Sequence, residues 1–267
     1  MITSFNHNAF SVTDMDKALD FYVGAVGMKR SHEFQRDGKP WIVYLTIAGN
    51  DSLELFYDGV RDRDPMYSEA QIGYHHWCIS CTDLLTLEKR IRAAGYISDD
   101  QHPVVTDEGG LNFWIHDPDG NALEILQYYP SERYDGRDEL LGIHHVGIAV
   151  NDMPRALDFY VGQLGLTFWK HMDREDGSGK PWIEFLNVNG HQTLELFHGA
   201  TEEVPNTWES AGSTHSCYNC PDIPETVEKL RAAGVPVIIE PNVGADGNLQ
   251  AWVTDPEGRR VELMSCL

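Results

Sequence analysis

The chain has 267 residues, of which 42% are hydrophobic and 23% charged, with 24 Gly and 13 Pro spread along its length. That length suits one large domain or two small ones with a full core, and the composition excludes collagen-like, low-complexity and disordered proteins. The 20 Lys and Arg set against 42 Asp and Glu give a net charge of −22, which repels phosphate backbones and anionic membranes. We therefore expect neither a nucleic-acid partner nor a membrane partner.

The sequence predicts a cytoplasmic protein. No stretch reaches the roughly 18 apolar residues of a membrane span, and the first residues lack a basic region followed by an apolar run. The five cysteines follow no dense spacing pattern, so structural disulfides are not indicated and a reducing compartment is favoured.

The chain contains a long internal repeat. Residues 13–28 return as residues 151–166, an offset of 138. Shorter pairs follow at similar offsets: 38–42 with 179–183, 53–56 with 194–197, 87–95 with 227–234, and 117–120 with 255–258. Such self-similarity indicates a duplicated unit. We predict two domains, residues 1–130 and 142–267, joined by a charged, Tyr- and Pro-containing linker at 131–141.

Each copy divides again into two similar modules. In the first, a strand is predicted over residues 7–12, a helix that begins after Asp14, and strands over 41–48 and 51–57 on either side of a Gly-Asn turn. The second repeats this order, with a strand over 75–81 and a helix over 84–94. The prediction is an α+β chain of four βαβββ modules.

Potential metal ligands stand at matching places in the four modules. A histidine precedes the helix-capping Asp by seven residues in each one, and each late strand carries a glutamate between apolar neighbours. A carboxylate on such a strand costs several kcal/mol unless a charged group receives it, and a divalent cation would do so. A lone histidine on an apolar strand is commonly a hydrogen-bonded core residue, but four in register with four glutamates favour metal binding. The candidate ligands are His7, Glu54, His76, Glu124, His145, Glu195, His215 and Glu262.

These motifs resemble those of the vicinal-oxygen-chelate superfamily, which includes glyoxalase I, epimerases, fosfomycin-resistance enzymes, extradiol dioxygenases and bleomycin-binding proteins. The resemblance rests on residues 143–152 and 156–160, on the two Leu-Glu-Leu-Phe strands, and on Asp-Pro-Asp-Gly followed by Leu123 and Glu124. It covers nearly the whole chain. It implies paired βαβββ modules that form two half-open barrels, the glyoxalase/bleomycin resistance/dioxygenase fold.

The resemblance also implies how the ligands are grouped. Pairing of modules within each copy would give one site from His7, Glu54, His76 and Glu124, and a second from His145, Glu195, His215 and Glu262. Pairing across the copies would instead group His7 and Glu54 with His215 and Glu262, and His145 and Glu195 with His76 and Glu124. Exchange of modules between chains is a further habit of the family, so that either a monomer or a homodimer is expected.

The resemblance implies an activity as well. Two His and two Glu on an octahedral ion leave two positions for the vicinal oxygens of a substrate, which favours a glyoxalase-like lyase or isomerase acting through a metal-stabilised enediolate. The cofactor would be a divalent ion, Ni, Zn, Co, Mn or Fe, at up to two per chain, and the partner a small-molecule substrate. The proton-moving glutamate would come from Glu54, Glu124, Glu195 and Glu262.

Two other functions stay open at the level of sequence. An Fe(II) extradiol ring-cleaving dioxygenase would use His145, His215 and Glu262, with His191 close to the position of its base. A metal-free ligand-binding or antibiotic-sequestering module is the other, although it needs none of the eight ligand-type residues.

Three further groups of residues have two interpretations each. Strand alternation puts Cys78 on the face of His76 and Cys81 on the other, which favours small core residues over a four-thiolate site with Cys217 and Cys220. The tryptophans paired by the repeat belong either to the core or to a cavity wall: Trp41 with Trp182, and Trp114 with Trp252. The basic residues either aid solubility or form a rim that holds an anionic group: Arg30, Arg36, Lys39, Lys170, Arg174 and Lys180.

Overall fold

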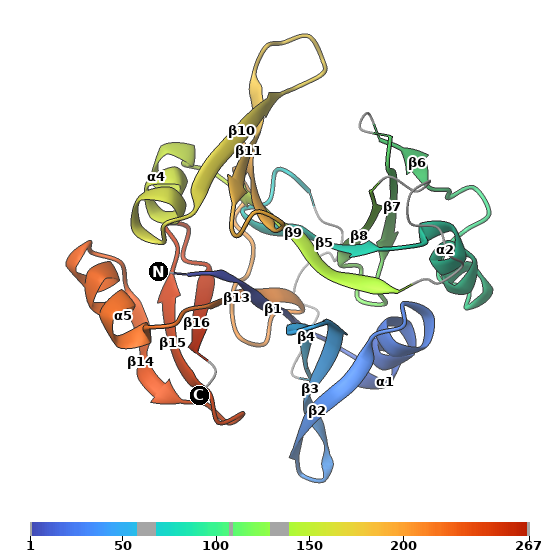
Figure 1. The fold of residues 1–267 in the computed structure, drawn as a ribbon, viewed down its shortest axis with the longest axis horizontal. Helices are drawn as coiled ribbons and strands as arrows, with labels where there is room; N and C mark the ends of the chain where they lie inside the picture. The colour runs from blue at the N-terminus through green and yellow to red at the C-terminus, as the bar shows by residue number, and fades with distance from the viewer. Residues whose placement is uncertain (1, 58–67, 107–108, 129–138, 266–267) are drawn as a thin grey trace.

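The computed structural model describes residues 2–57, 68–106, 109–128 and 139–265 (Figure 1). It contains the four predicted βαβββ modules, and its α+β fold agrees with the prediction. The first comprises β1 (Ser4–Ser11), α1 (Met15–Leu19) continued by the π-helix η1 (Asp20–Ala25), β2 (Lys29–Arg36), β3 (Lys39–Ala48) and β4 (Asp51–Phe56). The second comprises β5 (Gly73–Cys81), α2 (Leu84–Ala93), β6 (Val104–Val105), β7 (Leu111–His116) and β8 (Ala122–Gln127).

The second half of the chain repeats this order. The third module comprises β9 (Leu140–Val150), α4 (Met153–Leu157) continued by η2 (Asp158–Gln163), β10 (Thr167–Asp173), β11 (Pro181–Asn187) and β12 (Thr193–His198). The fourth comprises β13 (Gly212–Asn219), α5 (Ile223–Ala232), β14 (Val237–Val243), β15 (Leu249–Thr254) and β16 (Arg260–Ser265). Most of the predicted linker, residues 131–138, lies outside the described residues, and β9 begins at Leu140.

The recurring Asp after the first strand of each module caps a helix. Its side chain accepts a hydrogen bond from the backbone N–H three residues later, which satisfies a donor that the first helical turn leaves without a partner. The four pairs are Asp14 with Lys17, Asp83 with Thr86, Asp152 with Arg155, and Asp222 with Glu225. The seven-residue spacing from His to Asp therefore reflects a strand followed by a capped helix.

The modules pair across the two halves of the chain, not within them. One sheet has the strand order β14-β15-β16-β13-β1-β4-β3-β2, and the other has the order β10-β11-β12-β9-β5-β8-β7-β6. The first and fourth modules therefore share a sheet through antiparallel β1 and β13, and the second and third through antiparallel β5 and β9. Of the two pairings that the sequence left open, pairing across the copies is the arrangement observed, and neither barrel forms within one copy.

Consecutive modules meet through their helices and turns. The guanidinium of Arg90 on α2 donates to the carbonyls of Ala25 and Val26 at the end of η1, and Figure 1 shows α1 and α2 side by side. The Tyr22 hydroxyl donates to Asp117 in the Asp-Pro-Asp-Gly turn at 2.7 Å, and the equivalent Tyr160 donates to Asp255 at 3.0 Å. One apolar core runs through all four modules. The two halves are therefore interlocked, because each shares a sheet with the other.

Among the described residues, no helix combines the length and the apolar character needed to cross a bilayer. The four cysteines that the structure describes are free thiols.

Candidate metal centres

The eight candidate ligands come together in two clusters, one on each sheet. Each histidine lies on the first strand of its module, and these first strands pair with one another at the middle of each sheet. Each glutamate lies on the last strand of its module, which runs parallel to the first. Centre A consists of His7, Glu54, His215 and Glu262, and centre B of His76, Glu124, His145 and Glu195.

In centre A the donor atoms lie close to one another. The Nε2 atoms of His7 and His215 are 3.1 Å apart. The Glu54 Oε2 atom lies 3.4 Å from each of these nitrogens, and Glu262 Oε2 lies 3.1 and 3.3 Å from them. Ligands about 2.1 Å from a common ion are separated by about 3.0 Å in an octahedron and about 3.4 Å in a tetrahedron. The separations in centre A fall in this range.

Centre B is less regular. The Nε2 atoms of His76 and His145 are 2.8 Å apart, and Glu124 Oε2 lies 2.8 Å from His145 and 3.6 Å from His76. Glu195 is more distant, with its carboxylate oxygens 3.8 Å from His76 and 3.7 Å from His145. Three of the four ligands therefore form a tight group, and Glu195 lies beside it.

The structure selects the second of the two ligand groupings that the sequence left open, the one with modules paired across the copies. Neither His7 with His76 nor His145 with His215 shares a centre, because their strands belong to different sheets. The three ligands of the dioxygenase alternative are separated for the same reason. His145 is in centre B, whereas His215 and Glu262 are in centre A. All modules carry equivalent ligands on equivalent strands, so the residues alone do not state which modules pair.

Neighbouring side chains orient the histidines differently in the two centres. In centre A, Nδ1 of His7 contacts the Asn6 side-chain oxygen at 2.9 Å, and Nδ1 of His215 contacts the Thr214 hydroxyl at 3.0 Å. A ring that donates from Nδ1 presents the lone pair of Nε2 to an ion, so Asn6 favours the ligating tautomer of His7.

In centre B the preceding residue is an imidazole each time. Nδ1 of His76 lies 2.7 Å from Nδ1 of His75, and Nδ1 of His145 lies 2.7 Å from Nδ1 of His144. The carboxylate of Glu124 is held from its other side by Asn112, whose amide donates to Oε1 at 2.7 Å. Asn112 was not predicted from the sequence, because nothing local distinguishes it from other polar strand residues.

The charges of the two centres also differ. In centre A, burial opposes ionisation of Glu54 and Glu262, but hydrogen bonds from His215 and His7 outweigh it and lower the pKa of both carboxyls. In centre B, burial raises the pKa of Glu195, with the nearby Glu124 charge adding to it, and burial raises the pKa of Glu124. Burial also lowers the pKa of His145 to about 3.

The residues of both centres fit a divalent ion. Neutral imidazole nitrogens and carboxylate oxygens are the donors that borderline ions such as Zn, Ni, Co, Mn and Fe accept. All eight side chains are nearly buried, with exposed fractions of 9% or less. Without a cation, centre B places two neutral imidazole nitrogens 2.8 Å apart next to buried carboxyls whose charged form is disfavoured. A cation would provide the missing charge.

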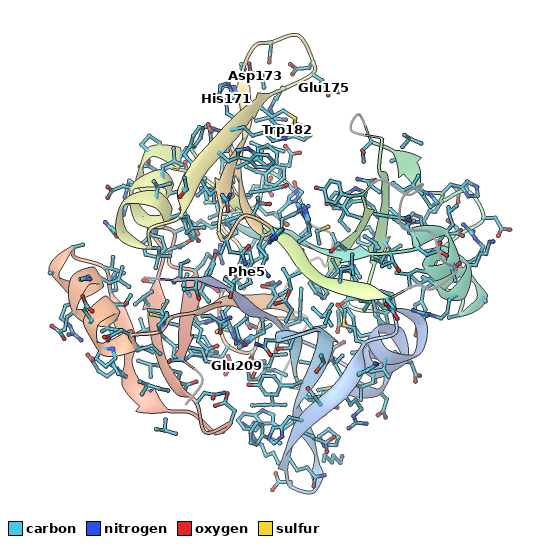
Figure 2. All side chains as sticks on the ribbon, in the orientation of Figure 1. Phe5, His171, Asp173, Glu175, Trp182 and Glu209 are labelled. Atoms are coloured by element: carbon cyan, nitrogen blue, oxygen red, sulfur yellow. The ribbon has the colours of Figure 1, made fainter. Side chains whose placement is uncertain are left out.

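Centre B opens into a cavity of about 550 Å³. The walls are largely aromatic, and Trp182, labelled in Figure 2, lies on the β10–β11 hairpin at its side. Lys170 also lines the cavity, with its Nζ 4.5 Å from the centre of the Trp169 ring. The aromatic lining residues are Trp114, Tyr128, Trp169, Trp182, Phe185 and Phe197.

The lining of the cavity decides between the two interpretations of the tryptophans and of some basic residues. Trp114 and Trp182 form its wall, whereas Trp252 packs against the His215 ring of centre A at 4.4 Å and Trp41 lies under the Arg36 guanidinium. Of the basic residues in question, Lys170 is among the lining residues. Arg174 is held at 3.0 Å by Glu69, which lines the cavity as well.

Comparisons with known proteins agree with this architecture. The description "Glyoxalase/Bleomycin resistance protein/Dioxygenase superfamily" matches residues 4–125 and again residues 142–263. The chain is 26% identical over 177 residues to a lactoylglutathione lyase of Arabidopsis thaliana, a match that covers 64% of this chain and 58% of the relative's length. It is 23% identical to glyoxalase I of Saccharomyces cerevisiae, with 97% of this chain and 91% of the yeast protein covered.

Among solved structures, glyoxalase I of Zea mays is similar over 98% of this chain and 92% of its own, with a TM-score of 0.72 at 20% identity. This likeness concerns the fold. The two matched segments together cover most of the sequence, and the chain therefore belongs to the glyoxalase/bleomycin resistance protein/dioxygenase superfamily.

Proposed function

We propose that the chain is a metal-dependent lyase of the glyoxalase type and that centre B is its working site. The observation that carries this proposal is a close group of two histidines and Glu124, with Glu195 beside it, that faces an aromatic cavity large enough for a small substrate. The names of the relatives, lactoylglutathione lyase and glyoxalase I, support the same activity.

The proposed substrate is the adduct of a 2-oxoaldehyde and a thiol such as glutathione. A divalent ion held by centre B would act as a Lewis acid toward the two neighbouring oxygens of such an adduct. The protein itself has to move one proton between the two adjacent carbons that carry those oxygens. The aromatic walls exclude water from this step, and Lys170 offers a positive charge to a carboxylate on the substrate.

We assign the proton transfer to Glu195. Glu124 is fixed by contacts of 2.8 Å to His145 and 2.7 Å to Asn112, whereas Glu195 lies 3.7 Å or more from both histidines. A loosely held carboxylate at the cavity suits a group that takes up and returns a proton.

Replacement of Glu195 by Gln tests this assignment. Because Gln cannot accept the proton, we expect kcat on the adduct of methylglyoxal and glutathione to fall by about 10²- to 10⁴-fold. Glu54→Gln is the matched variant, since Glu54 occupies the equivalent position in centre A. If centre B is the working site, the loss in Glu54→Gln is at least about tenfold smaller than the loss in Glu195→Gln.

Other outcomes would contradict the proposal. Equal losses in both variants would assign turnover to both centres. A wild-type enzyme that is inactive on thiol adducts but consumes oxygen with a catechol would replace the lyase by a ring-cleaving reaction. An absence of bound metal after purification without chelator would favour a binding module.

A further inference from the structure

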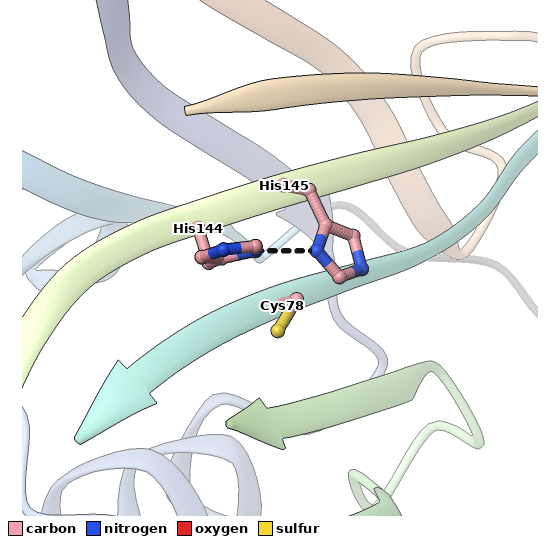
Figure 3. Close-up of side chains that lie close together, drawn as sticks. All are labelled: Cys78, His144 and His145. Atoms are coloured by element: carbon pink, nitrogen blue, oxygen red, sulfur yellow. Dashed lines mark hydrogen bonds between the residues drawn. The ribbon is translucent and has the colours of Figure 1, made fainter. Parts of the chain in front are cut away.

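A cysteine and two histidines lie together next to centre B, and both histidines line the cavity. The Cys78 sulfur and one nitrogen each from His144 and His145 are all within 4.8 Å of one another. Figure 3 shows Cys78 on β5 next to the pair of imidazoles on β9, with a hydrogen bond between His144 and His145. Cys78 on β5 is the register partner of His145 on β9, so the sheet itself holds the thiol against that ring.

We propose that Cys78, His144 and His145 form a second metal-binding set, selective for thiophilic ions such as Zn²⁺, Cd²⁺ or Cu⁺, which overlaps centre B through His145. One sulfur and two imidazole nitrogens are a softer donor set than the two histidines and two carboxylates of centre B. The proposal does not depend on the lyase activity, because it concerns binding alone.

The shared histidine makes the two sets mutually exclusive. His145 directs Nε2 toward His76 and Glu124, and directs Nδ1 toward His144. A neutral imidazole has a single nitrogen with a free lone pair. When Nε2 ligates in centre B, the proton is on Nδ1. When Nδ1 ligates the thiophilic ion, the proton is on Nε2, and centre B loses that ligand.

The surroundings allow an ion to reach this set. His144 and His145 both line the cavity, so an ion can enter by the route of the substrate. The two Nδ1 atoms, now 2.7 Å apart, would separate to about 3.4 Å around a tetrahedral ion. Cys78 is a free thiol and carries a proton before an ion binds. As the sulfur–metal bond forms, the S–H bond breaks and one proton leaves to the solvent buffer.

Centre A offers a natural comparison. Cys217 occupies the equivalent position there, as the register partner of both His7 and Glu262. The residue before His7 is Asn6 where centre B has His144 before His145, so one soft nitrogen donor is replaced by an amide. The softer set is therefore expected at centre B and not at centre A.

The test is titration of Cd²⁺ into the full chain after removal of metal, followed by the ultraviolet sulfur-to-cadmium charge-transfer band. We expect wild type and Cys217→Ser to show the band and Cys78→Ser to lack it. His144→Asn, which copies Asn6, should bind Cd²⁺ with the band at least about tenfold more weakly. Unchanged circular dichroism and thermal midpoints establish that each variant is folded.

Three results would overturn the proposal: a band that persists in Cys78→Ser, one that is lost in Cys217→Ser, or wild-type affinity in His144→Asn. The last would mean that the thiol joins the ligands of centre B directly. The mutual exclusion has a separate readout with protein loaded with Mn²⁺. Cd²⁺ should release Mn²⁺ at a lower concentration from wild type than from Cys78→Ser, measured as free Mn²⁺ by electron paramagnetic resonance, and identical release curves would refute it.

Discussion

At the scale of single residues, the two centres differ in how closely their surroundings pack on the ligands. Gly147 follows His145 by two residues on β9, and a Cβ atom built there would lie 2.5 Å from the His76 ring and 3.1 Å from Phe197. Real Cβ atoms do not approach so closely, so a side chain at this position would displace the imidazole. The equivalent residue in centre A is Ala9. Centre B therefore requires a glycine at position 147, whereas centre A accommodates the Ala9 side chain at the equivalent position.

Gly147→Ala should weaken metal binding in centre B by about 10- to 100-fold, because a displaced His76 ring no longer directs its lone pair at the ion. Isothermal titration calorimetry of the metal-free chain with Zn²⁺ measures this weakening, which appears as the loss of one of two binding phases. Ala9→Gly is the control at the equivalent position, where no crowding is relieved or created, and both phases should persist. Unchanged affinity in Gly147→Ala would mean that the sheet adjusts at no cost to the centre.

At the scale of elements, the Asp-Pro-Asp/Glu-Gly turns bind each helix to the sheet of the other module in the same half. Asp117 is buried and accepts hydrogen bonds from the Tyr22 hydroxyl at 2.7 Å and from the backbone of Asp119 and Asn121. Burial raises the pKa of Asp117 to about 6, and it does the same for Asp255 in the second half. The repeat preserves these turns for a structural reason that is separate from the metal centres.

The raised pKa of Asp117 predicts a dependence of stability on pH. The folded protein binds the proton more tightly than the unfolded chain, whose Asp pKa is near 3.9. The protonated Asp117 carboxyl therefore adds to the free energy of unfolding. This stabilisation is fully present below pH 4 and is lost as pH rises through about 6. With a chelator present, the difference in unfolding free energy between wild type and Asp117→Asn should fall by about 2–3 kcal/mol from pH 4 to pH 7.

Urea unfolding at the two pH values measures this difference. Asp255→Asn is the matched variant and should show a change of the same sign. A difference that is constant between pH 4 and pH 7 would mean that Asp117 ionises in the folded protein as easily as in the unfolded chain.

At the scale of the whole molecule, each half of the chain completes the sheet of the other. His7 and His215 come from opposite ends of the sequence and yet have nitrogens 3.1 Å apart, whereas the two histidines of the first half lie in different sheets. Neither half contains all four ligands of one centre. The halves are therefore expected to bind metal only as parts of one assembled chain.

Paired substitutions of histidine measure this connectivity through metal content. His7→Ala with His215→Ala removes both imidazoles of centre A, and about one ion per chain should remain, in centre B. His7→Ala with His76→Ala damages both centres, and the content should fall close to zero. Pairing within each half would retain one ion in the second combination and none in the first. Elemental analysis of protein with unchanged circular dichroism distinguishes the two.

Sequence alone determined the local structure and predicted the kind of chemistry. The repeat, the strand and helix patterns and the capping aspartates define the four βαβββ modules, because hydrophobic periodicity and caps act over a few residues. The eight ligands could be named for a similar reason. The charge of a glutamate between apolar strand residues is costly unless a charged group receives it, and such a glutamate recurs together with a histidine in every module.

Only the tertiary structure decided which modules share a sheet. The strands β1, β5, β9 and β13 each carry a histidine at the equivalent position, so the ligands do not decide between β1–β5 and β1–β13 pairing, which depends on how all helices and turns pack at once. That choice assigns His145 and His215 to different centres, opens the cavity at centre B, and brings Cys78 against His145. Contacts between residues far apart in sequence depend on the packing of the whole chain, and local patterns do not contain them.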